Sequence, residues 1–308
     1  MPKPYCRGCN LGPASLQQTG VAHHTSAMRS PFQAFPEGPA ICRFEELEVP
    51  PDLRVLVLAP HPDDFDVIAV TLRRLLQEGN PIHLAVLTSG ASGVEPGFCL
   101  GGDWETRSEL REHEQRRSCR FFGLPEANFE FLRLNEDQTG HLTGDGDNLE
   151  GIRTCLADRA PDIVFLPHGN DTNADHRRTY YMLRQIAAFS ELTLMAFLVR
   201  DPKTIEMRDE VVTFFAQEEA DWKAELMRFH ESQQQRNLNV RGYGFDERIL
   251  RLNQETTARV LASGQAGQSP SPQEATPAAS SPDNAFAESF EIELWEEGQP
   301  STLAYRAG

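Results

Sequence analysis

Short apolar runs alternate with helical patterns along this chain, and this alternation constrains the fold more than any other feature. Runs rich in Val, Ile, Leu and Phe, as in strands buried on both faces, occupy 54–60, 81–90, 162–168 and 192–199. Further strands are expected at 128–134, 210–216 and 285–295, and helices at 63–78, 104–122, 147–159, 174–189 and 218–235. Such alternation is typical of a mostly parallel sheet with helices on both faces. We therefore predict a Rossmann-like three-layer α/β/α sandwich.

Composition divides the chain into four expected segments. Residues 1–45, rich in Pro, Gly, Ser and Gln, predict an irregular N-terminal lead-in, followed by one α/β domain over 46–262. Residues 263–284 are of low complexity and predict a loop or linker. The segment 285–308 begins apolar again, and we expect it to dock on the main domain as a strand.

Charge and hydropathy indicate an enzyme acting on a small molecule. The formal net charge of -17 argues against a nucleic-acid partner, which needs a basic face. No apolar run approaches the roughly 20 residues of a membrane span, and the N-terminus lacks the apolar core of a signal peptide. A cytoplasmic location is therefore expected. Cys6 and Cys9 form the one Cys-x-x-Cys pair, whose surroundings fit no zinc module, so free thiols are expected.

Polar side chains follow two of the predicted buried strands. His61, Asp63 and Asp64 come after the run 54–60, and His176 comes shortly after 162–168. Ligands of open α/β sheets bind beyond the carboxyl ends of the strands. His61, Asp64 and His176 form a plausible three-ligand zinc set with an open position, although imidazole also suits Fe²⁺. Asp63 lies beside a ligand, as a general base should.

A structural explanation of the same residues stays open. Asp63 or Asp64 can cap the following helix, with Pro62 setting the entry of the chain. His176 alone can be an ordinary hydrogen-bonded surface residue. The metal site is favoured because both motifs follow buried strands in one α/β pattern.

The motif "APHPDD" at 59–64, with "NADH" at 173–176, resembles the PIG-L or LmbE-like zinc-dependent de-N-acetylases. The resemblance extends over about residues 52–240 and implies the same Rossmann-like fold. It implies Zn²⁺ held by His61, Asp64 and His176, with Asp63 as general base on metal-bound water. The implied reaction removes the N-acetyl group from an N-acetylglucosamine-type sugar or sugar conjugate, so the expected partner is a small N-acetylated sugar.

The chain departs from the usual family pattern at the second motif. Asn173 stands where many relatives carry the first histidine of "HPDH", and it cannot titrate. His168 is nearby in sequence and can replace that histidine, or it can be a polar residue at a strand end. Asp171 and Asp175 can orient a ligand histidine through its second nitrogen, although Asp175 can equally cap the next helix.

The remaining candidates are Arg111 and Glu114, which match an "RxxE" feature of the family. They can face substrate hydroxyls, or they can form a solvated salt bridge on a charged helix. Two alternative functions also remain: an amidase of a thiol-sugar conjugate, and a non-catalytic binding or scaffold protein that retains the metal-site fold. The sequence does not identify the acetylated substrate or the oligomeric state.

Overall fold

The computed structural model describes residues 41–190, 192–267, 285–296 and 299–302. Its strands are β1 (Cys42–Arg43), β2 (Val55–Ala59), β3 (Ile82–Val86), β4 (Phe129–Phe131), β5 (Ile163–Pro167), β6 (Leu194–Val199), β7 (Val211–Phe215), β8 (Phe286–Glu296) and β9 (Gln299–Thr302). Its α-helices are α1 (Ala69–Gln77), α2 (Trp104–Phe122), α3 (Gly146–Arg159), α4 (Ala174–Ser190), α5 (Gln217–Met227), α6 (Glu231–Arg241) and α7 (Phe245–Gly267). No helix among these residues is long and apolar enough to cross a membrane.

The strands form one mixed, mostly parallel sheet. Its order is β1-β7-β8-β6-β5-β2-β3-β4, and β9 pairs with β8. The strands from β4 to β6 are all parallel, with Val57 opposite Leu84 on one side and Phe165 on the other. The long strand β8 runs antiparallel between β6 and β7. The predicted fold class is therefore confirmed.

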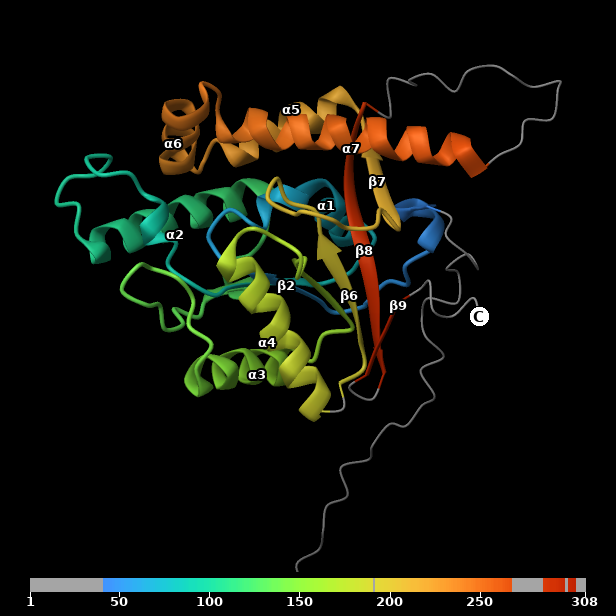
Figure 1. Ribbon diagram of the computed structural model, residues 1–308, viewed down its shortest axis with the longest axis horizontal. Helices are drawn as coiled ribbons and strands as arrows, with labels where there is room; N and C mark the ends of the chain where they lie inside the picture. Colours follow the sequence, from blue (N-terminus) through green and yellow to red (C-terminus); the bar gives the residue numbers. More distant parts are fainter. Residues whose placement is uncertain (1–40, 191, 268–284, 297–298, 303–308) are drawn as a thin grey trace, which may run out of the picture. The chain divides into compact units, whose positions relative to one another are not determined.

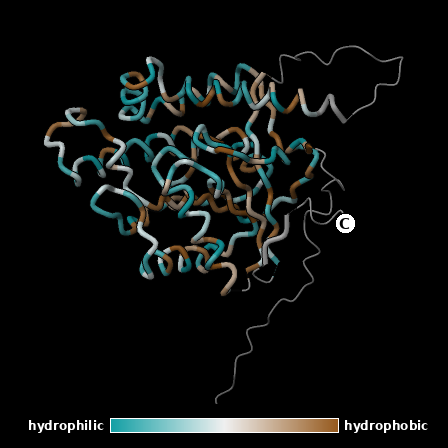
Figure 2. Tube along the Cα trace, in the orientation of Figure 1, coloured by the Kyte–Doolittle hydropathy of each residue, from teal (hydrophilic) through white to brown (hydrophobic). Residues whose placement is uncertain are grey.

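Helices cover both faces of this sheet (Figure 1). On one face, α3 and α4 pack on β2, β5 and β6 through a core that includes Leu56, Leu166 and Leu183. On the other face, α1, α5 and α7 lie over β7 and β8, where Phe215 contacts Phe286. Hydrophobic residues are concentrated in the strands of the sheet (Figure 2), as burial on both faces requires.

Three segments differ from the helices expected from sequence. The segment 63–78 is helical only from residue 66, as a 3₁₀ turn at Asp66–Ile68 and then α1. The expected helix 218–235 is two helices: α5 ends at Met227, and α6 begins after the buried His230. Helix α7 was not expected, and it runs past residue 262. The segments expected at 1–45 and 263–284 lie mostly outside the described residues, and the division into four segments stays a prediction.

The sheet places β2 at a topological switch point. The chain passes from β2 to β3 on one side, whereas β5 pairs with the other side of β2. The loops after β2 and β5 therefore diverge and leave a crevice at the carboxyl edge, which is where open α/β sheets bind ligands.

Candidate functional site

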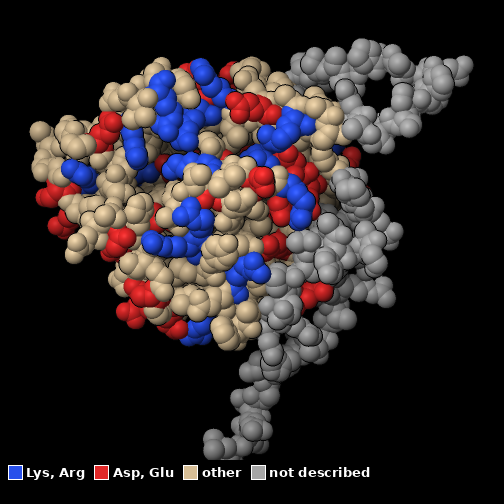
Figure 3. Space-filling view, in the orientation of Figure 1, with Lys and Arg blue, Asp and Glu red and all other residues tan. Residues whose placement is uncertain are grey.

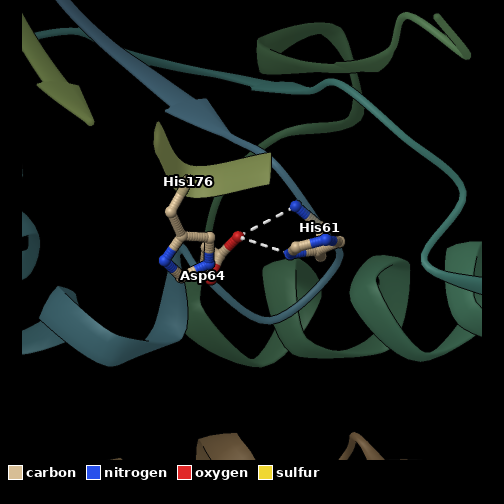
Figure 4. A group of neighbouring side chains, drawn as sticks. All are labelled: His61, Asp64 and His176. Carbon is tan, nitrogen blue, oxygen red and sulfur yellow. Dashed lines mark hydrogen bonds and ion pairs between the residues drawn. The ribbon is translucent and has the colours of Figure 1, made fainter. Parts of the chain in front are cut away.

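Three side chains converge at this crevice. His61 and Asp64 lie in the turn after β2, and His176 lies in the first turn of α4, which follows β5. Nδ1 of His61 and Nε2 of His176 each lie 3.4 Å from a different oxygen of Asp64. One ligand atom from each of the three residues lies within 4.8 Å of the others. Figure 4 shows the carboxylate of Asp64 between the two rings.

The turn after β2 is shaped by its own hydrogen bonds. The carboxylate of Asp64 accepts a hydrogen bond from the backbone N–H of His61 at 2.8 Å. Gly90, in the loop after β3, has φ +63°, and a Cβ atom on it would lie 2.9 Å from Cδ of Pro62. A side chain at Gly90 would therefore push against the turn that positions His61 and Asp64.

Carboxylates hold the second nitrogen of both imidazoles. Nε2 of His61 lies 3.0 Å from Oδ2 of Asp175, and Nδ1 of His176 lies 3.2 Å from Oδ2 of Asp171. Because a carboxylate accepts, these nitrogens donate, and loss of the proton from the nitrogens that face Asp64 would leave lone pairs there for a metal. Such carboxylate–histidine pairs are typical of metal-binding histidines. The donor set fits Zn²⁺ or another divalent metal such as Fe²⁺.

The three side chains also bias each other's protonation. Burial favours neutral His61, but hydrogen bonds to Asp175 and Asp64 outweigh it and raise the pKa of His61 to about 9. Burial likewise opposes the charge on His176, yet Asp64 and Asp171 raise its pKa well above the ordinary value. Burial alone would raise the pKa of Asp64, but the two histidines hold it well below its usual range. The site therefore favours an ionised carboxylate that can bind a cation.

Asp63 is held in an uncommon backbone conformation beside these ligands. Its φ is +118°, a region that non-glycine residues seldom occupy. Its backbone N–H donates to Oε1 of Gln115 at 2.8 Å, and its carboxylate accepts from Nη2 of Arg111 at 2.9 Å. The side chain of Asp63 remains 14% exposed and lines the cavity, so this carboxylate is positioned but still accessible.

Arg111 and Glu114 lie inside the protein rather than on a solvated helix face. Each is 1% exposed, and Nη1 of Arg111 donates to Glu114 at 3.0 Å. Glu114 also accepts from the backbone N–H and the hydroxyl of Ser232. Arg111 lines the cavity, but its fork is occupied by Asp63, Glu114 and the carbonyl of Pro62. Arg111 therefore supports the carboxylate of Asp63. Contact of Arg111 or Glu114 with substrate stays a prediction.

Asn173 and His168, the two candidates for the role of the second-motif histidine, lie in different places. Asn173 lines the cavity, and its Oδ1 accepts the backbone N–H of Asp175 at 3.1 Å, as a cap at the start of α4. His168 is not among the cavity residues. Its Nδ1 accepts the N–H of Asn170 at 2.9 Å, and its Nε2 lies 3.5 Å from Glu291. The geometry thus brings Asn173, but not His168, to the ligands.

Two residues missed by the sequence analysis also face this site. His141, in the loop between β4 and α3, lies with Nδ1 3.0 Å from the same Asp175 oxygen that holds His61. Asp201 follows β6, and burial raises the pKa of its carboxyl group. The position of Asp201 just after an expected strand was a usable signal, whereas nothing in the sequence around His141 indicated its place.

The ligands and Asp63 open into one cavity of about 360 Å³. Its walls come from the turn after β2, the loops after β3, β4, β5 and β6, and the helices α2, α4, α6 and α7. A space of this size accepts a sugar unit with a substituent. The metal, base and substrate-contact roles of the individual residues stay predictions.

Solved structures share this fold. The chain aligns with N,N'-diacetylchitobiose deacetylase from Pyrococcus horikoshii at a TM-score of 0.58 and 18% identity, covering 78% of this chain and 83% of that one. It aligns with 4-carboxy-2-hydroxymuconate hydratase from Pseudomonas putida at 0.57 and 16%, covering 78% and 95%. A zinc-inhibited form of teicoplanin deacetylase aligns at 0.51 and 12%, covering 78% and 98%. At these identities the likeness establishes the fold alone.

Part of the sequence matches the model of a known protein family. Residues 56–187 match the family model PIG-L, described as GlcNAc-PI de-N-acetylase. No curated protein matches the chain significantly. The matched segment contains most of β2 and of α4, the three candidate ligands and Asp63. The resemblance expected from "HPDD" and "NADH" is thereby confirmed: residues 56–187 of this chain match the PIG-L family model.

Proposed function

We propose that this protein is a metal-dependent N-deacetylase, which hydrolyses the acetyl amide of an N-acetylglucosamine-type sugar or sugar conjugate. The observation that carries the proposal is the convergence of His61, Asp64 and His176 beside an accessible Asp63 in one cavity. The family of residues 56–187 supports the reaction type. Two of the structural neighbours reported above are named as deacetylases, and one of these is a zinc-inhibited form.

His61, Asp64 and His176 would hold the metal, and Zn²⁺ is the ion proposed, with Fe²⁺ as an alternative. A divalent metal there would polarise the amide carbonyl and make water more acidic. Asp175 and Asp171 keep the two imidazole rings in the orientation and tautomer that ligation needs.

Asp63 is proposed as the general base. Its carboxylate, fixed by Arg111, takes a proton from water in the cavity as that water attacks the acetyl carbonyl. It then returns the proton to the nitrogen as the carbon–nitrogen bond breaks, so acetate and a free amine leave. The amide nitrogen of Asn173 is a donor at the cavity wall and can hydrogen bond to the carbonyl oxygen as charge develops there.

The test is amine release from a panel of N-acetylated amino sugars, by protein stripped of metal and then supplied with Zn²⁺ or Fe²⁺. Asp63→Asn should keep its metal and lose at least about 100-fold in kcat, because general-base catalysis typically contributes this much. Asp147→Asn, at an exposed position of α3, is the matched control and should behave as wild type.

The outcomes separate the alternatives. If His61→Ala and His176→Ala bind as much metal as the unmodified protein by elemental analysis, the ligand assignment is wrong. If folded, metal-loaded protein releases no amine from any acetylated sugar, the deacetylase proposal fails. A panel of thiol-sugar conjugate amides would then distinguish an amidase from a non-catalytic binding protein.

A further inference from the structure

Two polar side chains at the α5–α6 junction, residues 228–232, are fully buried. They are His230, just before α6, and Ser232, in its first turn. The outer side of this region is charged, and Figure 3 shows Lys and Arg side chains gathered where Figure 1 places α6 and the start of α7. Basic residues of these two helices line the cavity: Arg236, Arg241 and Arg248. His230 and Ser232 differ from them, because both make their contacts inside the protein, behind the turn that follows β2.

His230 holds the turn after β2 through Asp66. Asp66 comes two residues after Asp64 and is fully buried. One of its carboxylate oxygens accepts a hydrogen bond from Nε2 of His230, and the other accepts one from the hydroxyl of Ser118 at 2.7 Å. The backbone N–H of Asp66 donates to the carbonyl of Asp63 at 3.0 Å. A shift of Asp66 would therefore move the backbone that carries Asp63 and Asp64.

The other ring nitrogen of His230 is left without a partner. Nδ1 is buried, and it forms no hydrogen bond within the part of the chain that the structure describes. An unsatisfied buried nitrogen costs free energy, so stability alone does not account for a histidine at this position. What the imidazole does supply is the hydrogen bond that fixes the carboxylate of Asp66.

Ser232 reaches Asp63 from the same junction through two charged side chains. The backbone N–H and the hydroxyl of Ser232 donate to different oxygens of Glu114, at 2.7 and 2.8 Å. Glu114 accepts from Nη1 of Arg111, whose Nη2 holds the carboxylate of Asp63. The positions of both oxygens of Glu114 are thus set by α6, and Glu114 in turn orients the guanidinium group that fixes Asp63.

The turn after β2 needs such support because its backbone is strained. Asp63 has φ +118°, and a conformation of this kind persists only where its surroundings over-determine it. Ser232 restrains the side chain of Asp63, and His230 restrains the residues that follow it. A third contact comes from α5, where Nζ of Lys223 donates to the carbonyl of Val67 at 2.6 Å. The segment from α5 to α6 therefore holds the turn from behind.

From these contacts, and given the proposed deacetylase function, we infer that His230 and Ser232 are positioning residues of the reaction. His230 sets the place of the metal ligand Asp64 through Asp66, and Ser232 sets the place of the base Asp63. Neither His230 nor Ser232 is among the residues that line the cavity, so both act through the turn rather than on the substrate. The α5–α6 junction thereby keeps the metal ligand and the base in their relative positions.

Zn²⁺ affinity, which needs no turnover, tests the role of His230. Full-length protein is titrated with Zn²⁺ in competition with a chromophoric chelator. His230→Leu should bind Zn²⁺ about 10- to 100-fold more weakly, the usual effect of removing a group that supports a metal ligand. His230→Gln should recover most of the affinity, because its side-chain amide keeps a donor for Asp66. Circular dichroism spectra establish that each variant is folded.

The matched control is another histidine bonded to a carboxylate. His83 lies near the amino end of β3, at the opposite edge of the sheet, with Nε2 2.8 Å from Glu130. His83→Leu also removes an imidazole from its carboxylate partner, but it should leave the Zn²⁺ affinity within about twofold of the unmodified protein, as a distant, independent site does.

A double-mutant cycle tests the role of Ser232. Ser232→Ala should lower kcat about 10-fold, because a small displacement of a catalytic group is costly, and should leave the Zn²⁺ affinity within about twofold. In protein that already carries Asp63→Asn, Ser232→Ala should have no further effect on kcat, because the base that it positions is gone. General destabilisation would instead lower the activity by the same factor in both backgrounds.

The outcomes keep the two proposals apart. If His230→Leu binds Zn²⁺ as tightly as the unmodified protein, or loses no more affinity than His83→Leu, the role of His230 is overturned. Equal effects of Ser232→Ala with and without Asp63→Asn overturn the role of Ser232. If metal-loaded, unmodified protein releases no amine, the deacetylase proposal fails, but the Zn²⁺ affinities still decide the role of His230. The Ser232 cycle is then read as free energies of unfolding, and additive effects overturn its coupling to Asp63.

Discussion

Replacing the buried arginine beside Asp63 tests whether this arginine compensates the negative charges around it. Arg111 is 1% exposed and lies between the carboxylates of Asp63 and Glu114, at 2.9 and 3.0 Å. Arg111→Leu fills part of the same space with an apolar side chain but leaves the carboxylates of Asp63 and Glu114 without their cation. Removing one partner of a buried ion pair costs about 3–5 kcal/mol in the free energy of unfolding. In a chain of this size, each kcal/mol lowers Tm by about 2–4 °C, so a decrease of about 6–20 °C is expected.

The measurements are urea denaturation, which gives the free energy of unfolding, and thermal denaturation, which gives Tm, each followed by circular dichroism. Arg120→Leu is the control on the same helix, because its ion pair with Glu126 is exposed on both sides, at 62% and 57%. That substitution should cost about 0–1 kcal/mol. Arg111→Lys should fall between the two, since an ammonium group restores the charge but not the planar fork. Equal, small losses for Arg111→Leu and Arg120→Leu would refute the view that Arg111 compensates buried charge.

Three further predictions concern other buried groups. Burial and Arg159 lower the pKa of His83, so the unfolded chain binds its proton more readily, and the folded protein should lose stability as the pH falls below the ordinary value of 6.5. His83→Gln should flatten the decrease in Tm between pH 7 and 5, and an unchanged slope would contradict this. Burial raises the pKa of Cys119 far above its usual range, so iodoacetamide at pH 8 should label the half-exposed Cys99 first, as read by peptide mass spectrometry. Lys223→Met should lower the urea-derived free energy of unfolding by about 3–5 kcal/mol, because it leaves the buried carboxylate of Glu288 without its cation, which now lies 2.7 Å away. A change below about 1 kcal/mol would show that the hydrogen bonds from Val70 and Thr71 are enough to hold this carboxylate.

The sequence was most informative where the physics is local. Apolar runs marked most of the strands from β2 to β8, because strands buried on both faces are mostly apolar. Helices α2 and α4 begin where the sequence predicted, and the N-cap Asp103 of α2 accepts a hydrogen bond from the N–H of Thr106. The predicted helix boundaries were wrong at 63–68 and at 228–230, because tertiary contacts there override helical periodicity.

The sequence by itself determined the fold class and the chemistry available at the strand ends. His61, Asp64 and His176 could be grouped from sequence, because carboxyl ends of parallel strands meet at one edge of a sheet. Only the tertiary structure decided which other groups join them. His141 and Arg248 come from a loop and a helix whose approach depends on packing across the whole domain. Likewise, the charged helix pair Arg111 and Glu114 became a buried support for Asp63, because helical spacing does not reveal which face another element covers.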